Sequence, residues 1–199
     1  MSGERQVHWG QGAFLSPQHL QAQDLWQQAG RHALHLRLTP FPWGFEMLRV
    51  REDALASGVV DVERFALVTR DGERLLGGTL DTAPGNARVP QRNIADLPVS
   101  SSDPIPVWLV FNRERALQGL ATRESGRLAS RHALASDSLG DPYDPQAPEA
   151  EVDFLLHQAN IVTGLDENAE AIVRGSDSYK FAELVPAGPG KFKLSADYI

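Results

Sequence analysis

Two histidines one helical turn apart are the first residues whose types and spacing suggest chemistry. His32 and His35 lie in a predicted helix, where this spacing allows both imidazoles to approach one ligand position. A zinc site needs a third and usually a fourth protein ligand, and the nearest carboxylate, Asp24, lies about two turns away. We therefore interpret the pair as ordinary residues of an amphipathic helix, and we predict no metal and no cofactor.

Other catalytic patterns are incomplete. The carboxylates between residues 137 and 153 lack the order of an EF-hand loop, so a solvated acidic loop is the better interpretation. The chain contains no Gly-x-Ser-x-Gly, P-loop or Gly-x-Gly-x-x-Gly pattern. Acid–base pairs among the 26 acidic residues stay open, because any two can meet in a fold. We expect a protein that is not an enzyme and has no catalytic residues.

Composition excludes several classes of protein. The net charge of −7 argues against a nucleic-acid binder with a general basic surface. The absence of cysteine excludes disulfide scaffolds, thiolate metal sites and cysteine nucleophiles. No apolar run is long enough to span a membrane, and the first residues do not form a signal peptide. We expect a cytoplasmic protein with no direct membrane insertion.

An amphipathic helix is predicted over residues 17–37. Ser16 is a suitable N-cap and Pro17 suits the first helical position. Prolines at 40 and 42 end the pattern. Its apolar residues recur three or four positions apart and define one face, on which Trp26 is expected to belong to the core: Ala22, Trp26, Ala29, Ala33 and Leu36.

The chain after Pro40 is predicted to be β. Strands are predicted at 45–50, 59–69, 74–76, 106–111, 152–157, 159–162, 181–185 and 191–194. Asp71-Gly72 marks a turn, the most apolar run, 106–111, is expected at the centre of a sheet, and the last two strands form a hairpin. The stretches 77–103 and 136–150 are predicted to be long irregular loops. The pattern favours a mainly β fold, a β-sandwich or partly open barrel, with one N-terminal helix.

The segment before the helix carries the strongest interaction pattern. Trp9, Phe14 and Leu15 are large apolar residues, and the helix behind them begins with glutamines and a histidine. Such a segment either packs on its own domain or presents anchors to a partner, and physical reasoning alone weights the two equally.

This segment also resembles a known family. The string Trp9-x-x-Gly12-x-Phe14-Leu15-x-Pro17-Gln18-His19-x-Gln21-x-Gln23-Asp24 is similar to the N-terminal signature of TssK (ImpJ/VasE), a baseplate subunit of type VI secretion. Residues 42–45, 55–60, 71–72, 181–185 and 193–199 resemble later parts of the same pattern. Ser16 stands where a basic residue is expected and Leu20 where an aromatic is common, and residues 80–150 give little to match.

The resemblance implies a fold and partners. It implies a β-sandwich similar to the shoulder of phage receptor-binding proteins, in a homotrimer whose N-terminal domains dock on the TssF–TssG wedge of the baseplate. Residues 1–199 then form a single shoulder-like domain, with an arm over 1–16, a helix over 17–37 and a sandwich over 43–199. The family's neck and head are absent from this sequence, so contacts with the membrane-complex proteins TssL and TssM are expected only for that C-terminal region. The baseplate lies at the cytoplasmic side of the inner membrane.

The residue patterns and the resemblance point to the same interface. Buried apolar anchors would each contribute about 1.5–3 kcal/mol, and polar side chains would set the register. An alternative function is a receptor- or carbohydrate-binding β-sandwich of phage-tail type, for which Tyr143 is the one aromatic residue in the long loops. The predicted interface comprises Trp9, Phe14, Leu15, Pro17, Gln18, His19, Leu20, Gln21, Gln23 and Asp24.

The resemblance also predicts weak self-association of this 199-residue chain. A neck that would hold three chains together is absent from the sequence, so we expect a weak trimer or none. Light scattering over a concentration series measures the mass, and a tight trimer at micromolar concentration would contradict the expectation.

Overall fold

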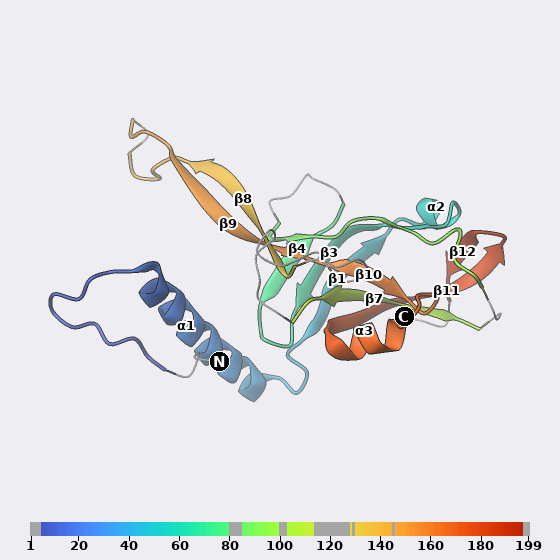
Figure 1. Ribbon diagram of the computed structural model, residues 1–199, viewed down its shortest axis with the longest axis horizontal. Helices are drawn as coiled ribbons and strands as arrows, with labels where there is room; N and C mark the ends of the chain where they lie inside the picture. Colours follow the sequence, from blue (N-terminus) through green and yellow to red (C-terminus); the bar gives the residue numbers. More distant parts are fainter. Residues whose placement is uncertain are drawn as a thin grey trace. The chain divides into compact units, whose positions relative to one another are not determined.

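The structure is a computed structural model that describes residues 5–79, 85–99, 103–113, 128, 130–144 and 146–196. The chain forms two compact units. Unit 1 comprises residues 1–46 and 67–74, and unit 2 comprises residues 47–66 and 75–199. The fold is mainly β with one long N-terminal helix, as predicted (Figure 1).

The helix of unit 1, α1 (Pro17–Leu38), begins directly after Ser16 with proline at its first position. It ends at Thr39, whose N–H donates to the carbonyl of His35 at 3.1 Å. None of its residues is buried. Trp26 is only half-buried, so the expectation that it belongs to the core is wrong.

The predicted apolar face of α1 is covered only in its first part. Ala22 and Ala29 are half-buried, whereas Ala33 and Leu36 are exposed. Helical periodicity correctly groups these residues on one side. Periodicity does not show which part of the helix other residues pack against.

A tight turn in unit 1 packs against this helix. The turn follows β3 (Val62–Val68), and the N–H of Gly72 donates to the carbonyl of Thr69 at 2.9 Å. Gly72 has φ +79°, and a β-carbon there would lie 3.0 Å from Nδ1 of His32. Glycine at this position therefore serves both the predicted turn and the close approach of the helix.

The strands of the described residues form three sheets. The six-stranded sheet has the order β1-β3-β4-β5-β9-β8, the four-stranded sheet β10-β7-β11-β12, and β2 pairs with β6. The remaining strands of the large sheet are β1 (Gly44–Val50), β4 (Arg74–Gly77), β5 (Ala87–Arg88), β8 (His132–Leu139) and β9 (Ala150–Gln158). The others are β2 (Val59–Val60), β6 (Arg92–Asn93), β7 (Ile105–Phe111), β10 (Asn160–Thr163), β11 (Asp177–Gly188) and β12 (Lys191–Leu194).

Two of the strand predictions are confirmed in detail. The apolar strand β7 lies inside its sheet, where Leu109 pairs with Ile161 on one side and with Tyr179 on the other. The last two strands form the predicted antiparallel hairpin, with Leu184 opposite Leu194.

Other parts of the sequence-based prediction are wrong. Two short helices, α2 (Glu52–Leu55) and α3 (Ala169–Gly175), interrupt the region predicted to be wholly β. In α3, Ile172 and Val173 pack against Val110 and Val162, so β-branched residues serve a helix here because tertiary packing outweighs propensity.

The two stretches predicted to be irregular also contain strands. β5 and β6 lie within 77–103, and residues 136–139 extend β8. The outer part of β8 has little strand character of its own and is held by its pairing with β9. Residues 80–84, 100–102 and 145 of these stretches lie outside the described residues.

The core of unit 2 is built from both large sheets. Phe65 and Leu75 are buried in the six-stranded sheet, and Val107, Phe111 and Leu184 are buried in the four-stranded sheet. Burial of such side chains is the main favourable contribution to folding.

A buried carboxylate stabilises unit 2. Asp61 is fully buried, and its side chain accepts from Arg51 at 3.1 Å, from the hydroxyl of Thr79 at 2.5 Å and from the amide of Gln91 at 2.9 Å. A charge is tolerated in the interior only when its oxygens are satisfied in this way.

We expect Asp61→Ala to lower the free energy of unfolding by about 1–3 kcal/mol, because three donors lose their acceptor. Urea unfolding measures the effect. The control is Glu170→Ala, which removes an exposed ion pair with Arg174 and is expected to cost less than about 1 kcal/mol. Equal losses in the two variants would contradict the structural role of Asp61.

Candidate protein-interaction site

Residues 5–16, called the arm from here on, precede α1 without helix or strand. A single turn shapes the arm: the N–H of Ala13 donates to the carbonyl of Gly10 at 3.2 Å. Gly12 within this turn has φ +80°, a conformation that favours glycine. The turn places Phe14 and Leu15 directly before the helix.

The large apolar side chains of the arm are exposed. Phe14 is 95% exposed and Leu15 68%, while Trp9 and Leu20 are each about half exposed. Of the two interpretations that the sequence left open, packing of the arm on its own domain does not account for Phe14 and Leu15. Adjacent exposed apolar side chains of this size are typical of an interaction surface.

His19 has a local structural task. Its Nδ1 accepts from the backbone N–H of Ser16 at 3.3 Å and lies 2.7 Å from the Ser16 hydroxyl oxygen. These contacts form a capping arrangement at the start of α1, with histidine in the place usually taken by glutamate. The rings of His19 and Trp9 lie 6.1 Å apart, centroid to centroid, so the same histidine also supports the arm.

The other predicted interface residues divide into two groups. Gln23 is half-buried, and its Oε1 has no hydrogen-bond partner among the described residues. The exposed members, whose side chains are available to a partner, are Pro17, Gln18, Gln21 and Asp24. The structure thus brings together Trp9 and His19.

A second exposed surface on α1 escaped the sequence analysis. Leu34 is 55% exposed and Leu38 70%, and both share one side of the helix with Arg31 and Leu20. We call these four residues the exposed stripe. The leucines at 34, 36 and 38 could have indicated a second apolar surface in the sequence. The amphipathic pattern, however, included Leu36 and left out Leu34 and Leu38.

A hollow of about 390 Å³ lies beside the exposed stripe. Trp26, Gln27, Gly30 and Arg31 line it. Gly30 contributes to the space, because a β-carbon there would have no atom within 4 Å.

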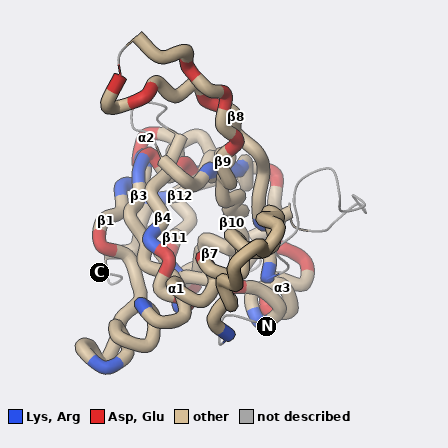
Figure 2. Tube along the Cα trace, turned by 90° about the vertical axis from the view of Figure 1, so that its left-hand side faces the viewer, with Lys and Arg blue, Asp and Glu red and all other residues tan. Residues whose placement is uncertain are grey.

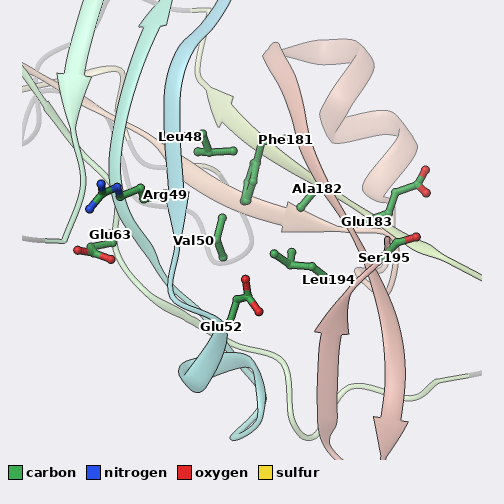
Figure 3. A pocket seen from close by; sticks show the side chains of 10 residues that line it. All are labelled: Leu48, Arg49, Val50, Glu52, Glu63, Phe181, Ala182, Glu183, Leu194 and Ser195. Atoms are coloured by element: carbon green, nitrogen blue, oxygen red, sulfur yellow. The ribbon is translucent and has the colours of Figure 1, made fainter. Parts of the chain in front are cut away.

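Unit 2 contains an open groove of similar volume, about 390 Å³, between strands of its two large sheets (Figure 3). Leu48 and Val50 of β1 point towards Phe181 of β11 and Leu194 of β12 across an apolar floor. The rim carries carboxylates, of which Glu183 pairs with Lys180 at 2.5 Å. Among the described residues that line it there is no imidazole, and nothing here resembles a nucleophile–histidine pair.

Within the ranges that the structure describes, no three His, Cys, Asp or Glu residues gather as a metal site. Across the same ranges, no helix combines the length and apolar character needed to cross a membrane.

A match to a known family covers the chain from the first turn of α1 onwards and does not include the arm. Residues 19–199 match the family described as bacterial type VI secretion, which includes EvfL, ImpJ and VasE. No curated protein matches the sequence.

Three solved structures share the fold. The crystal structure of TssK is 17% identical with a TM-score of 0.73, and the match covers 96% of this chain and 41% of that one. A chain of the TssK–TssF–TssG baseplate subcomplex of the type VI secretion system is 19% identical with a TM-score of 0.74, covering 98% and 61%. A chain of the type VI secretion baseplate complex is 18% identical with a TM-score of 0.72, covering 98% and 58%. The chain therefore spans about half the length of the chains it resembles.

We expect His19→Ala to destabilise the first turn of α1 by about 0.5–2 kcal/mol, because the N-cap loses its side-chain partner. Amide hydrogen exchange of residues 17–22 measures the change. His19→Gln retains an acceptor at this position and is expected to restore most of the protection. Equal exchange in the two variants would argue against the capping role.

Proposed function

The chain belongs to the bacterial type VI secretion family of EvfL, ImpJ and VasE, and from this membership we propose that it is a structural subunit of the secretion baseplate. It acts by binding its neighbours and not by catalysis. The chains of similar fold in a TssK–TssF–TssG subcomplex and in a baseplate complex support this role.

The docking surface is the arm together with the first turns of α1. The observation that carries this assignment is the exposure of Phe14 and Leu15, side by side, at the point where the arm meets a capped helix. The capping contacts of His19 hold the junction in place, so binding requires little further ordering of its backbone.

The partner of this surface is the TssF–TssG wedge, and other copies of the chain complete a trimer. Residues 1–199 act as one shoulder-like docking domain on the cytoplasmic side of the inner membrane. Contacts with TssL and TssM belong to the C-terminal region of longer family members. The exposed amides of Gln18 and Gln21 set the register, because amide groups specify position more than they add affinity.

A second candidate is the binding of a receptor or a carbohydrate. Tyr143, which is 95% exposed between β8 and β9, is the observation that favours it. A glycan array separates the two functions, since a structural subunit gives no hits.

We expect Phe14→Ala combined with Leu15→Ala to weaken binding to co-purified TssF–TssG by tenfold or more. Each side chain contributes about 1.5–3 kcal/mol when it is fully desolvated, and tenfold corresponds to about 1.4 kcal/mol. Titration calorimetry measures the dissociation constant. Thermal unfolding is expected to stay unchanged, because neither side chain is buried in the chain itself.

The matched control is Phe41→Ala, which removes a highly exposed phenylalanine of unit 1 outside the arm. It should leave wedge binding unchanged. Unaltered binding of the Phe14/Leu15 variant would overturn the docking assignment.

A further inference from the structure

A two-stranded ribbon extends from the six-stranded sheet of unit 2. β8 and β9 pair along their whole length, from His132 opposite His157 to Leu139 opposite Ala150. β5 pairs with β9 at His157 and Gln158, so among the described residues the outer part of this pair has no third strand. Figure 1 shows it reaching beyond the other strands of its unit. We call residues 133–139 and 150–156 the ribbon.

In the outer part of the ribbon, beyond the pair of Leu134 and Leu155, one face is mainly apolar and the other is acidic. Ala135 opposite Phe154 and Leu139 opposite Ala150 lie on the apolar face, together with the pair of Asp137 and Val152. The opposite face carries Leu134 and Leu155 near the base of the ribbon, which are 56% and 54% exposed. Further out it carries Asp153, which accepts from the hydroxyl of Ser136 at 2.6 Å, and Ser138, which donates to Glu149 just before β9 at 2.6 Å.

Large side chains on the mainly apolar face of the ribbon are partly exposed. Phe154 is 43% exposed, and Leu139 is exposed to the same extent. A two-stranded ribbon is only marginally stable in water unless a third strand or a helix covers its apolar face. The ribbon therefore suits a helix that arrives from elsewhere.

The charge of the β8–β9 region favours a helix that carries basic residues. Of the acidic residues in these two strands, Asp137 lies on the mainly apolar face, and Glu151 and Asp153 lie on the opposite one. Between residues 132 and 158 the chain has no Lys or Arg, and Figure 2 shows acidic residues along the ribbon. These acidic residues are Asp137, Asp141, Asp144, Glu149, Glu151 and Asp153. Residues 25–45, which include most of α1, have the opposite pattern, with Arg31 and Arg37 and no Asp or Glu.

The exposed stripe of α1 matches the ribbon in length. From Leu20 to Leu38 the helix rises about 27 Å, and an eight-residue strand such as β8 spans about 26 Å. Leu34 and Leu38 are exposed apolar residues on the same side as Arg31, and the hollow beside Gly30 offers space for a large side chain of the ribbon. The exposed stripe thus carries one arginine among apolar residues, and the mainly apolar face of the ribbon carries one aspartate.

We propose that the exposed stripe of α1 in one copy packs on the apolar face of the ribbon of a second copy, with Arg31 facing Asp137. Every copy carries both surfaces, so the contact repeats head to tail and closes into a ring when the rotation fits. The proposal rests on the trimer in the proposed function and supplies its contact.

Disulfide trapping tests the contact, because the chain has no cysteine of its own. Leu34→Cys and Phe154→Cys are made in separate chains, mixed at low salt and oxidised, and the products are separated on a non-reducing gel. We expect the mixed dimer to exceed either homodimer by roughly tenfold, which corresponds to about 1.4 kcal/mol of preference. Circular dichroism checks that each variant is folded, and Leu38→Cys with Ala135→Cys provides a second pair.

The matched control replaces Phe154→Cys by Ser138→Cys, which places the thiol on the acidic face of the same ribbon. This mixture should form no excess of mixed dimer. An equal excess, or no excess in the first mixture, overturns the proposal. A cross-link that forms only when both substitutions are in one chain also overturns it, because the helix then covers its own ribbon.

Swapping the charges at positions 31 and 137 separates a specific contact from a loss of structure, because only a specific contact is restored when both charges are reversed. Asp137→Arg in the ribbon partner, or Arg31→Asp in the helix partner, should each lower the yield of mixed dimer roughly fivefold, or about 1 kcal/mol. The two changes combined across the contact should restore it. Failure of the combination to restore the yield counts against the proposed pairing.

Disulfide trapping tests the contact between copies, and wedge binding tests the docking role of the arm, so the two proposals can fail separately. Loss of trapping with intact wedge binding would leave the docking role of the arm standing. Trapping together with wedge binding that Phe14→Ala and Leu15→Ala do not weaken would overturn the docking role and leave this contact standing.

Discussion

Burial of apolar side chains between two β-sheets is the interaction on which the rest of the structure depends. The buried strands β3, β7 and β11 provide it in unit 2. The helix α1 of unit 1 has no buried residue. The chain therefore folds a stable part of its own and keeps apolar surface on the arm, on α1 and on the ribbon.

The arm and the ribbon differ in the interactions that fix their backbone. His19 caps the helix beside the arm, whereas the outer ribbon depends on pairing between two strands alone. The arm presents a pair of adjacent anchors, a form suited to a partner pocket. The ribbon presents a broad face that carries one carboxylate, a form suited to a helix. We infer that they serve different contacts, one with the baseplate wedge and one between copies.

Much of the local structure followed from sequence patterns. Ser16-Pro17 predicted the helix start, Asp71-Gly72 the turn, and the apolar run around Leu109 an inner strand. Each of these depends on interactions between near neighbours or on burial of a continuous run. The outer half of β8 was missed, because Asp137 and Ser138 form a strand only through partners in β9.

Residue patterns alone were enough to predict the mainly β fold, the N-terminal helix and the segment that carries the interface pattern, because these follow from periodicity, capping and residue type. Only the tertiary structure decided which apolar residues stay uncovered. Trp26 and Leu36 were assigned to the same covered face, yet Leu36 is exposed, and Leu34 and Leu38 emerged as a second surface. The physical reason is that periodicity defines the sides of a helix, whereas exposure depends on how far its neighbours reach along it.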